Sequence, residues 1–287
     1  MKPTTFPAAL AAAYLLTVLS QAPANLSAGE AAVIDDSKNP QAAAPEEEAM
    51  TLYPIPDYSG DLLSRPALTG DWGGVRTSLA EYGLQFDVAV NQFYQGLVDG
   101  GRPRADSSWQ YSGTADYTLK LDTGKAGLWP GGFLEVHGQT FFGDPAALGS
   151  GALLPTNVNY ALSAPYGDGT YLPHVTMVQF LNEKFALVGG KINTAVGDPK
   201  AFTPSGVGLD SFMNMSFAFN PVTVHVSPYS TLAGGFLYMP NEKVTFGFTA
   251  FDSDGSMEET GFDTVFNGNT TYVGQLQVKT NFFERQG

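Results

Sequence analysis

Hydrophobic and polar residues alternate along WQYSGTADYTLKLD, residues 109–122. Every second residue from Trp109 to Leu121 is aromatic, aliphatic or small, and the residues between them are all polar. A period of two sends successive side chains to opposite faces, so the stretch predicts a β-strand with one apolar and one polar face. A protein core and a lipid bilayer would both satisfy the apolar face, and these alternatives imply different functions.

The same period predicts further strands along the chain, at 84–96, 133–142, 174–181, 185–193, 231–239, 243–251 and 270–283. With 109–122 they make about eight strands of roughly nine to fourteen residues, whereas soluble strands average about five to six and tilted membrane strands need about 9–11. Strand length therefore favours a barrel wall. The fold class we predict is all-β, an antiparallel up-and-down transmembrane β-barrel.

The connections between these strands alternate in length. Those after the first, third, fifth and seventh strands are long, about 12 to 36 residues, and the others are short turns at 123–132, 182–184 and 240–243. Long loops at one end and short turns at the other are typical of outer-membrane barrels. We also predict one short N-terminal helix in 68–83, with Asp71 as its cap and Gly83 as its end.

Aromatic residues favour lipid as the contact of the apolar face. Trp109 and Tyr111 lie at one end of the second strand, and Trp129 follows its other end, which resembles the two interfacial girdles of membrane barrels. We expect Trp109, Tyr111, Tyr117, Leu119 and Leu121 to face lipid. No apolar run reaches the 18 or so residues of a membrane-spanning helix, so a membrane location requires strands.

Composition excludes several classes of function. The formal net charge of −14 opposes binding to phosphate backbones, so nucleic acid is excluded as a partner. The chain has no cysteine and three histidines, without an HExxH motif, and its GDGT and GGK stretches lack the strand–loop–helix context of a phosphate loop. We therefore expect no enzyme activity, no cofactor and no metal.

The N-terminal part predicts export. Lys2 precedes the apolar stretch FPAALAAAYLLTVL, and APA at 22–24 offers small residues for cleavage. We interpret residues 1–24 as a signal peptide, with a disordered N-terminus as the alternative. Residues 25–60, rich in Ala, Pro and Glu, are interpreted as a flexible segment, and residues 61–287 as the barrel domain.

Several long motifs resemble the carbohydrate-selective outer-membrane porins of the OprB type. They are LTGDWGGVRTSLAEYGLQFDVAVNQFYQG, DYTLKLDTGKAGLWPGGFLEVHGQTFFG, QFLNEKFALVGGKIN and FMN at 212–214. The resemblance runs from about residue 60 to the end of the chain. It implies a barrel of about sixteen strands, of which about eight are present here, with the DWGG helix near the periplasmic mouth.

The resemblance further implies passive diffusion of carbohydrates across the bacterial outer membrane. The expected partners are small neutral sugars and outer-membrane lipid, with a homo-oligomer left open. By parity, the candidate residues lining the pore are Asp87, Asn91, Asp116, Lys120, Glu135, His137, Gln139, Lys191, Asn193, Gln275, Gln277 and Lys279. For any one of them the plainer interpretation is an ordinary residue of a wet wall. Lys191 and Asn193 weigh more, because GKIN matches the family motif.

Two alternative functions stay open. Because the chain stops at NFFERQG, after its eighth strand and without a C-terminal aromatic residue, we expect the barrel domain to be incomplete. The chain would then be a non-conducting, truncated porin fragment. The other alternative is an exported sugar-binding β-protein, which would be soluble without detergent.

Overall fold

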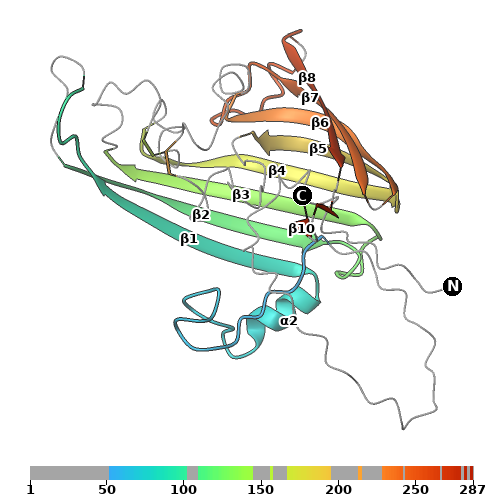
Figure 1. Cartoon of the computed structure of the whole chain (residues 1–287), viewed down its shortest axis with the longest axis horizontal. Helices are drawn as coiled ribbons and strands as arrows, with labels where there is room; N and C mark the ends of the chain where they lie inside the picture. Colours follow the sequence, from blue (N-terminus) through green and yellow to red (C-terminus); the bar gives the residue numbers. More distant parts are fainter. Residues whose placement is uncertain are drawn as a thin grey trace.

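The computed structural model describes residues 52–101, 109–144, 156–157, 167–194, 213–214, 228–241, 243–265 and 267–278, and the backbone of 281–282 and 285–286. Within them lie one helix, α2 (Val75–Glu81), and the strands β1 (Leu84–Gln95), β2 (Gln110–Asp122), β3 (Gly132–Gly143), β4 (Gly169–Asn182), β5 (Phe185–Asn193), β6 (Ser230–Asn241), β7 (Val244–Asp252) and β8 (Thr270–Val278). Figure 1 shows these eight strands side by side as one curved sheet, in the order of the sequence.

Each strand of the sheet pairs antiparallel with its neighbour in sequence. The predicted all-β, up-and-down order is therefore confirmed, and the three short turns lie together at one end, here called the turn end. In the described part of the chain β1 and β8 are the two edges of the sheet. The predicted signal peptide, residues 1–24, lies outside the described residues. No described helix is long and apolar enough to cross a membrane.

Two strand boundaries differ from the prediction by more than two residues. β4 begins at Gly169 rather than at residue 174, because a register shift in its pairing with β3 accommodates Pro173 within the strand. The predicted strand 270–283 ends at Val278, which pairs with Val244, the first residue of β7. No residue of β7 remains to pair beyond it, and the chain instead forms the small hairpin of β9 (Asn281–Phe282) and β10 (Arg285–Gln286).

The helix is shorter than predicted. Gly70, Gly73 and Gly74 have positive φ angles, so LTGDWGG forms a loop and α2 starts only at Val75. The N-cap is therefore Gly74 and not Asp71 as predicted. The Asp71 carboxylate nevertheless accepts hydrogen bonds from the Thr77 backbone N–H at 2.8 Å and the Thr77 hydroxyl at 2.9 Å, in the first turn of the helix. The predicted stop at Gly83 is confirmed.

The two faces of the sheet differ in both exposure and polarity. The outer face, on the side of Tyr117, exposes large apolar side chains, among them Phe86, Val88, Val90, Tyr111, Leu119, Leu187, Tyr238, Phe246, Tyr272 and Leu276. The inner face, on the side of Asp116, buries polar side chains, among them Asn91, Thr114, Lys120, Glu135, His137, Gln139 and Thr176. This arrangement reverses that of a soluble protein, in which apolar groups are buried and charged groups are exposed.

Substitution of Gly83 tests the junction between α2 and β1. Its φ is +85°, and a Cβ there would lie 2.6 Å from the Asp122 carbonyl oxygen. Gly127 also has a positive φ, +71°, but open space around it. We expect Gly127→Ala to cost about 1–2 kcal/mol of unfolding free energy, the backbone term alone.

Gly83→Ala adds the steric conflict and should cost at least about 1 kcal/mol more. Urea unfolding of both variants in detergent measures the difference. Equal costs would show that the Asp122 carbonyl does not constrain this junction.

Candidate functional site

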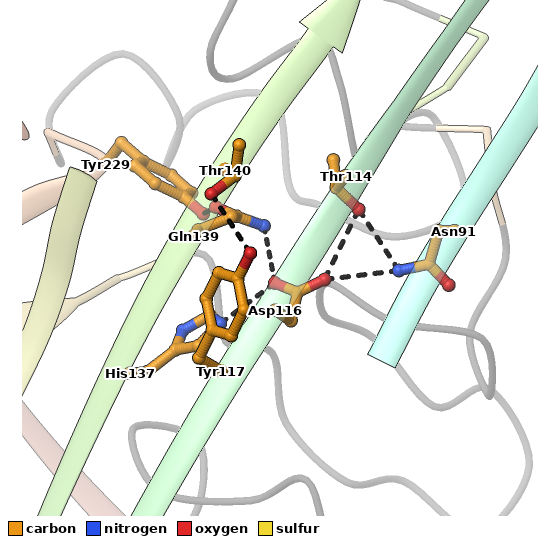
Figure 2. Close-up of polar contacts among 8 residues, drawn as sticks. All are labelled: Asn91, Thr114, Asp116, Tyr117, His137, Gln139, Thr140 and Tyr229. Carbon is orange, nitrogen blue, oxygen red and sulfur yellow. Dashed lines mark hydrogen bonds and ion pairs between the residues drawn. The ribbon is translucent and has the colours of Figure 1, made fainter. Parts of the chain in front are cut away.

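The Asp116 carboxylate is the hydrogen-bonding centre of the inner face. Its Oδ1 accepts from His137 Nε2 at 2.9 Å and from Gln139 Nε2 at 2.8 Å. Its Oδ2 accepts from Asn91 Nδ2 at 3.2 Å and from the Thr114 hydroxyl at 3.3 Å. Figure 2 shows these side chains converging on Asp116 from β1, β2 and β3. Four donors therefore stabilise one buried carboxylate, which is the condition under which a buried charge is tolerated.

Strand register brings these residues together. Asp116 on β2 lies directly opposite Gln139 on β3, and Asn91 on β1 lies opposite Thr114. His137 and Thr114 are each two residues from one of these pairs, so they share the inner face with them. Direct and diagonal neighbours across strands are within reach of long polar side chains. The period-two pattern of the sequence is thus sufficient to place this network on one face.

The network continues to the segment before β6. The Tyr229 hydroxyl donates to Gln139 Oε1 at 2.6 Å (Figure 2). Burial raises the pKa of the Tyr229 phenol, and the nearby charge of Asp116 raises it further. Tyr229 therefore remains a neutral hydrogen-bond donor at ordinary pH. It connects the polar wall of β1 to β3 with the segment that leads into β6.

A second polar group lies next to this network, toward the turn end. Lys120 on β2 faces Glu135 on β3, and His137 faces His174 on β4. His174 Nδ1 accepts from the backbone N–H of Asn193 at 3.2 Å. Within the described part of the chain, Glu135 Oε2 and His174 Nε2 are buried without a hydrogen-bond partner. Asn91 Oδ1, beside Asp116, is likewise buried without a partner, so two acceptor oxygens and one ring nitrogen of these two groups have unused hydrogen-bonding capacity.

Lys191 lies apart from both groups. It shares its side of β5 with the exposed Leu187, whereas Ala186 and Val188 on the other side are buried. Its ammonium group donates to the backbone carbonyl oxygens of Met257 and Glu259 in the connection between β7 and β8. The two predicted pore-lining residues of GKIN thus have different surroundings. Asn193 is buried beside His174, while Lys191 binds the connection between β7 and β8.

The other predicted residues are also spread along the sheet. Asp87 pairs with Arg76 of α2. Gln275 and Gln277 on β8 lie opposite Gly247 and Thr245, several strands away from Asp116. Lys279 lies outside the residues whose side chains are described. The structure therefore brings together Asn91, Asp116, His137 and Gln139, with Lys120, Glu135 and Asn193 nearby, and separates the rest.

The sequence-based prediction missed three residues of these two polar groups. Thr114 and His174 lie at inner positions of β2 and β4, so the alternation that selected Asp116 and Glu135 would have found them. Tyr229 precedes the first residue of β6, and no periodic signal marks it. Among the described residues, no group of three or more His, Cys, Asp or Glu side chains could hold a metal ion.

Two connections at the opposite end of the sheet, the loop end, meet the last residue of β1. Asn157, between β3 and β4, donates through Nδ2 to Gln95 Oε1 at 3.1 Å. Met213 of the FMN motif, between β5 and β6, accepts at its sulfur from Gln95 Nε2 at 3.4 Å. Residues from two long connections therefore reach β1 at the loop end of the sheet.

Comparison with solved structures shows a related fold. The chain is similar to the high-pH structure of Pseudomonas putida OprB, with a TM-score of 0.63 and 19% sequence identity. The similarity covers 76% of this chain and 53% of that chain, so the chain matches about half the length of the solved one. No family model and no curated protein matches the sequence. The sheet has the fold of part of a porin β-barrel.

Replacement of Asp116 tests the polar network. In Asp116→Asn the amide NH₂ must face one of the two pairs of donors, so two hydrogen bonds are lost and their donors remain buried. We expect a loss of about 2–4 kcal/mol in unfolding free energy. Asp254, which is exposed and accepts one bond from Asn269, provides the control.

Asp254→Asn should cost less than about 1 kcal/mol, because water replaces the lost contact. Urea titration of both variants gives the comparison. Equal losses would mean that the Asp116 carboxylate is not the centre of the network.

Proposed function

We propose that this chain forms the wall of an outer-membrane porin through which carbohydrates diffuse passively. The observation that carries the proposal is the reversal of the two faces, apolar and exposed outside, polar and buried inside. A protein folded in water gains nothing from exposing Val88, Val90 and Leu276, each more than half exposed. In a bilayer the same face contacts hydrocarbon, and the polar face lines the lumen.

Aromatic side chains support the lipid contact of the outer face. Phe185, Phe236, Phe248 and Tyr272 stack in a row across β5 to β8, with ring centroids 5.6, 5.8 and 6.2 Å apart. Trp109 stacks on Tyr94 at the loop end, with centroids 5.3 Å apart. Such rows cover the backbone with apolar surface, as strands in contact with hydrocarbon require.

The chemistry of the inner face supports neutral sugars as solutes. Its buried side chains carry amide, hydroxyl, carboxylate, imidazole and ammonium groups; Asp116 is hydrogen-bonded to His137, and Lys120 lies opposite Glu135. Groups of these kinds donate hydrogen bonds to sugar hydroxyl groups and accept hydrogen bonds from them. The resemblance to carbohydrate-selective porins supports the same solute class, and transport rather than catalysis.

Location in the outer membrane follows from the same arguments. The predicted signal peptide at residues 1–24 would export the chain, and strands rather than helices would hold it in the membrane. In a bilayer the edges β1 and β8 each need a partner strand, because unpaired backbone groups in hydrocarbon cost several kcal/mol. We infer that the functional form is a closed barrel.

Two neighbouring residues on β2 test the assignment of the faces. Leu119 is on the outer face and Thr118 on the inner face. Leu119→Lys should destabilise the inserted, folded state by about 2–4 kcal/mol if residue 119 lies near the midplane of the bilayer. Thr118→Lys should cost much less, because its ammonium group meets the polar wall.

Folding into lipid vesicles in the presence of urea measures both costs. If the two lysine variants lost the same free energy, the outer face would not contact lipid.

Sugar uptake tests the function itself. Proteoliposomes containing the chain should swell in iso-osmotic glucose faster than protein-free liposomes, and the rate should rise with the amount of protein. A solution of a sugar polymer too large for any porin provides the negative control. Swelling at the protein-free rate would reject the proposal and favour the non-conducting alternative. Full solubility of the chain without detergent would favour a sugar-binding protein instead.

A further inference from the structure

Two residues ahead of the barrel strands lie against the inner face. Leu52 and Tyr53 are 7% and 4% exposed, although they belong to a segment without regular structure. They complete an apolar cluster with inner-face residues of four strands at the turn end: Phe133, Val178, Phe180, Ala186, Val188, Leu237 and Met239. The Tyr53 ring meets the edge of Phe133 with centroids 5.6 Å apart. This part of the inner face is therefore apolar, and Leu52 and Tyr53 cover it.

Polar contacts hold the same segment at β1 and β2. Gln85 Nε2 donates to the carbonyl oxygens of Tyr53 at 3.2 Å and Pro54 at 3.0 Å. The Lys120 ammonium lies 5.6 Å from the centroid of the Tyr53 ring, a cation–π contact. Burial raises the pKa of the Tyr53 phenol, and the nearby carboxylates of Glu135 and Asp122 add to the effect. Tyr53 therefore stays neutral.

A second anchor lies a few residues further along. The Arg76 guanidinium stacks over the Tyr58 ring at 4.0 Å and lies 5.2 Å from the Trp72 ring. It also donates to the Phe86 carbonyl oxygen at 3.1 Å and pairs with the Asp87 carboxylate. Tyr58 is thus tied through Arg76 to β1, while Tyr53 is tied to the inner face. Residues 52–58 are held at both ends, and we call them the inner strap.

We propose that the inner strap occupies part of the channel at the turn end and that Tyr53 limits the size of the solutes that pass. This inference rests on the proposed channel function. In a barrel the inner face encloses the lumen, so a segment packed on it reduces the free cross-section there. The apolar cluster keeps the strap in place, because its release would expose seven inner-face apolar side chains to the wet lumen.

Cysteine labelling tests the position of the strap without any transport. The chain contains no cysteine, so Ala186→Cys creates a single thiol beneath the strap, at a residue that is fully buried. We expect a water-soluble maleimide to label it about tenfold faster after Leu52→Ser and Tyr53→Ser, since access controls the reaction. Gln275→Cys, partly exposed on the inner face of β8, is the control and should react at the same rate in both backgrounds.

Equal rates at Ala186→Cys with and without the two serine substitutions would overturn the placement of the strap. If the double variant does not fold, Gln85→Leu is the second variant, because it removes the two hydrogen bonds that hold the strap at β1 and leaves the side chains of Leu52 and Tyr53 unchanged. It should change the labelling rate in the same direction, by a smaller factor. Tyr53→Phe, which keeps the ring, should behave as the unaltered chain.

Uptake of sugars of different size tests the effect on the channel. The ratio of trisaccharide to monosaccharide uptake should rise about threefold or more in the Leu52→Ser, Tyr53→Ser chain, because a wider opening helps the larger solute more. An unchanged ratio, with the thiol at residue 186 newly reactive, would show that the strap covers the wall without limiting solutes. Absence of uptake by every chain would refute the channel and the strap's role in it, whatever the labelling shows.

Discussion

The alternation of side chains along a pleated strand is the constraint on which the other features depend. Because the period is two, a shift of register by one residue would exchange the faces of an entire strand. Asp116 makes such a shift costly, since its partners Asn91, His137 and Gln139 come from both neighbouring strands. The same register also places the alternate, apolar residues of each strand together on the outer face.

The inner face is divided into two zones of different chemistry. Around Asp116 and Glu135 it is polar and buried, and toward the turn end, at Phe133 and Val178, it is apolar and covered by the inner strap. The difference has a physical reason. Around Asp116 the buried polar groups are partners for one another, whereas a wall that carries another segment of the chain is stabilised by apolar packing. The polarity of each zone of the inner face therefore matches the groups that the zone contacts, polar side chains around Asp116 and the inner strap at the turn end.

This division explains how far the sequence could predict the molecule. In β2, alternation assigned Asp116 and Lys120 to the inner face, where the structure has them. In β5 the same rule assigned Lys191 to the polar wall, yet Ala186 and Val188 form the buried side there, because the strap covers them. The boundary at Gly169 was missed because Pro173 looks like a strand breaker until a register shift accommodates it. Contacts between distant segments leave no periodic signal.

The strap and the polar network also connect through single residues. Lys120 contacts the Tyr53 ring and faces Glu135, while Glu135 shares its strand and face with His137, a partner of Asp116. The Asp116 carboxylate itself has four donors, whereas Glu135 has a buried acceptor oxygen without a partner. Glu135 Oε2, next to the strap, and Asn91 Oδ1, beside Asp116, are the two acceptor oxygens of this polar zone that have no hydrogen-bond partner among the described residues.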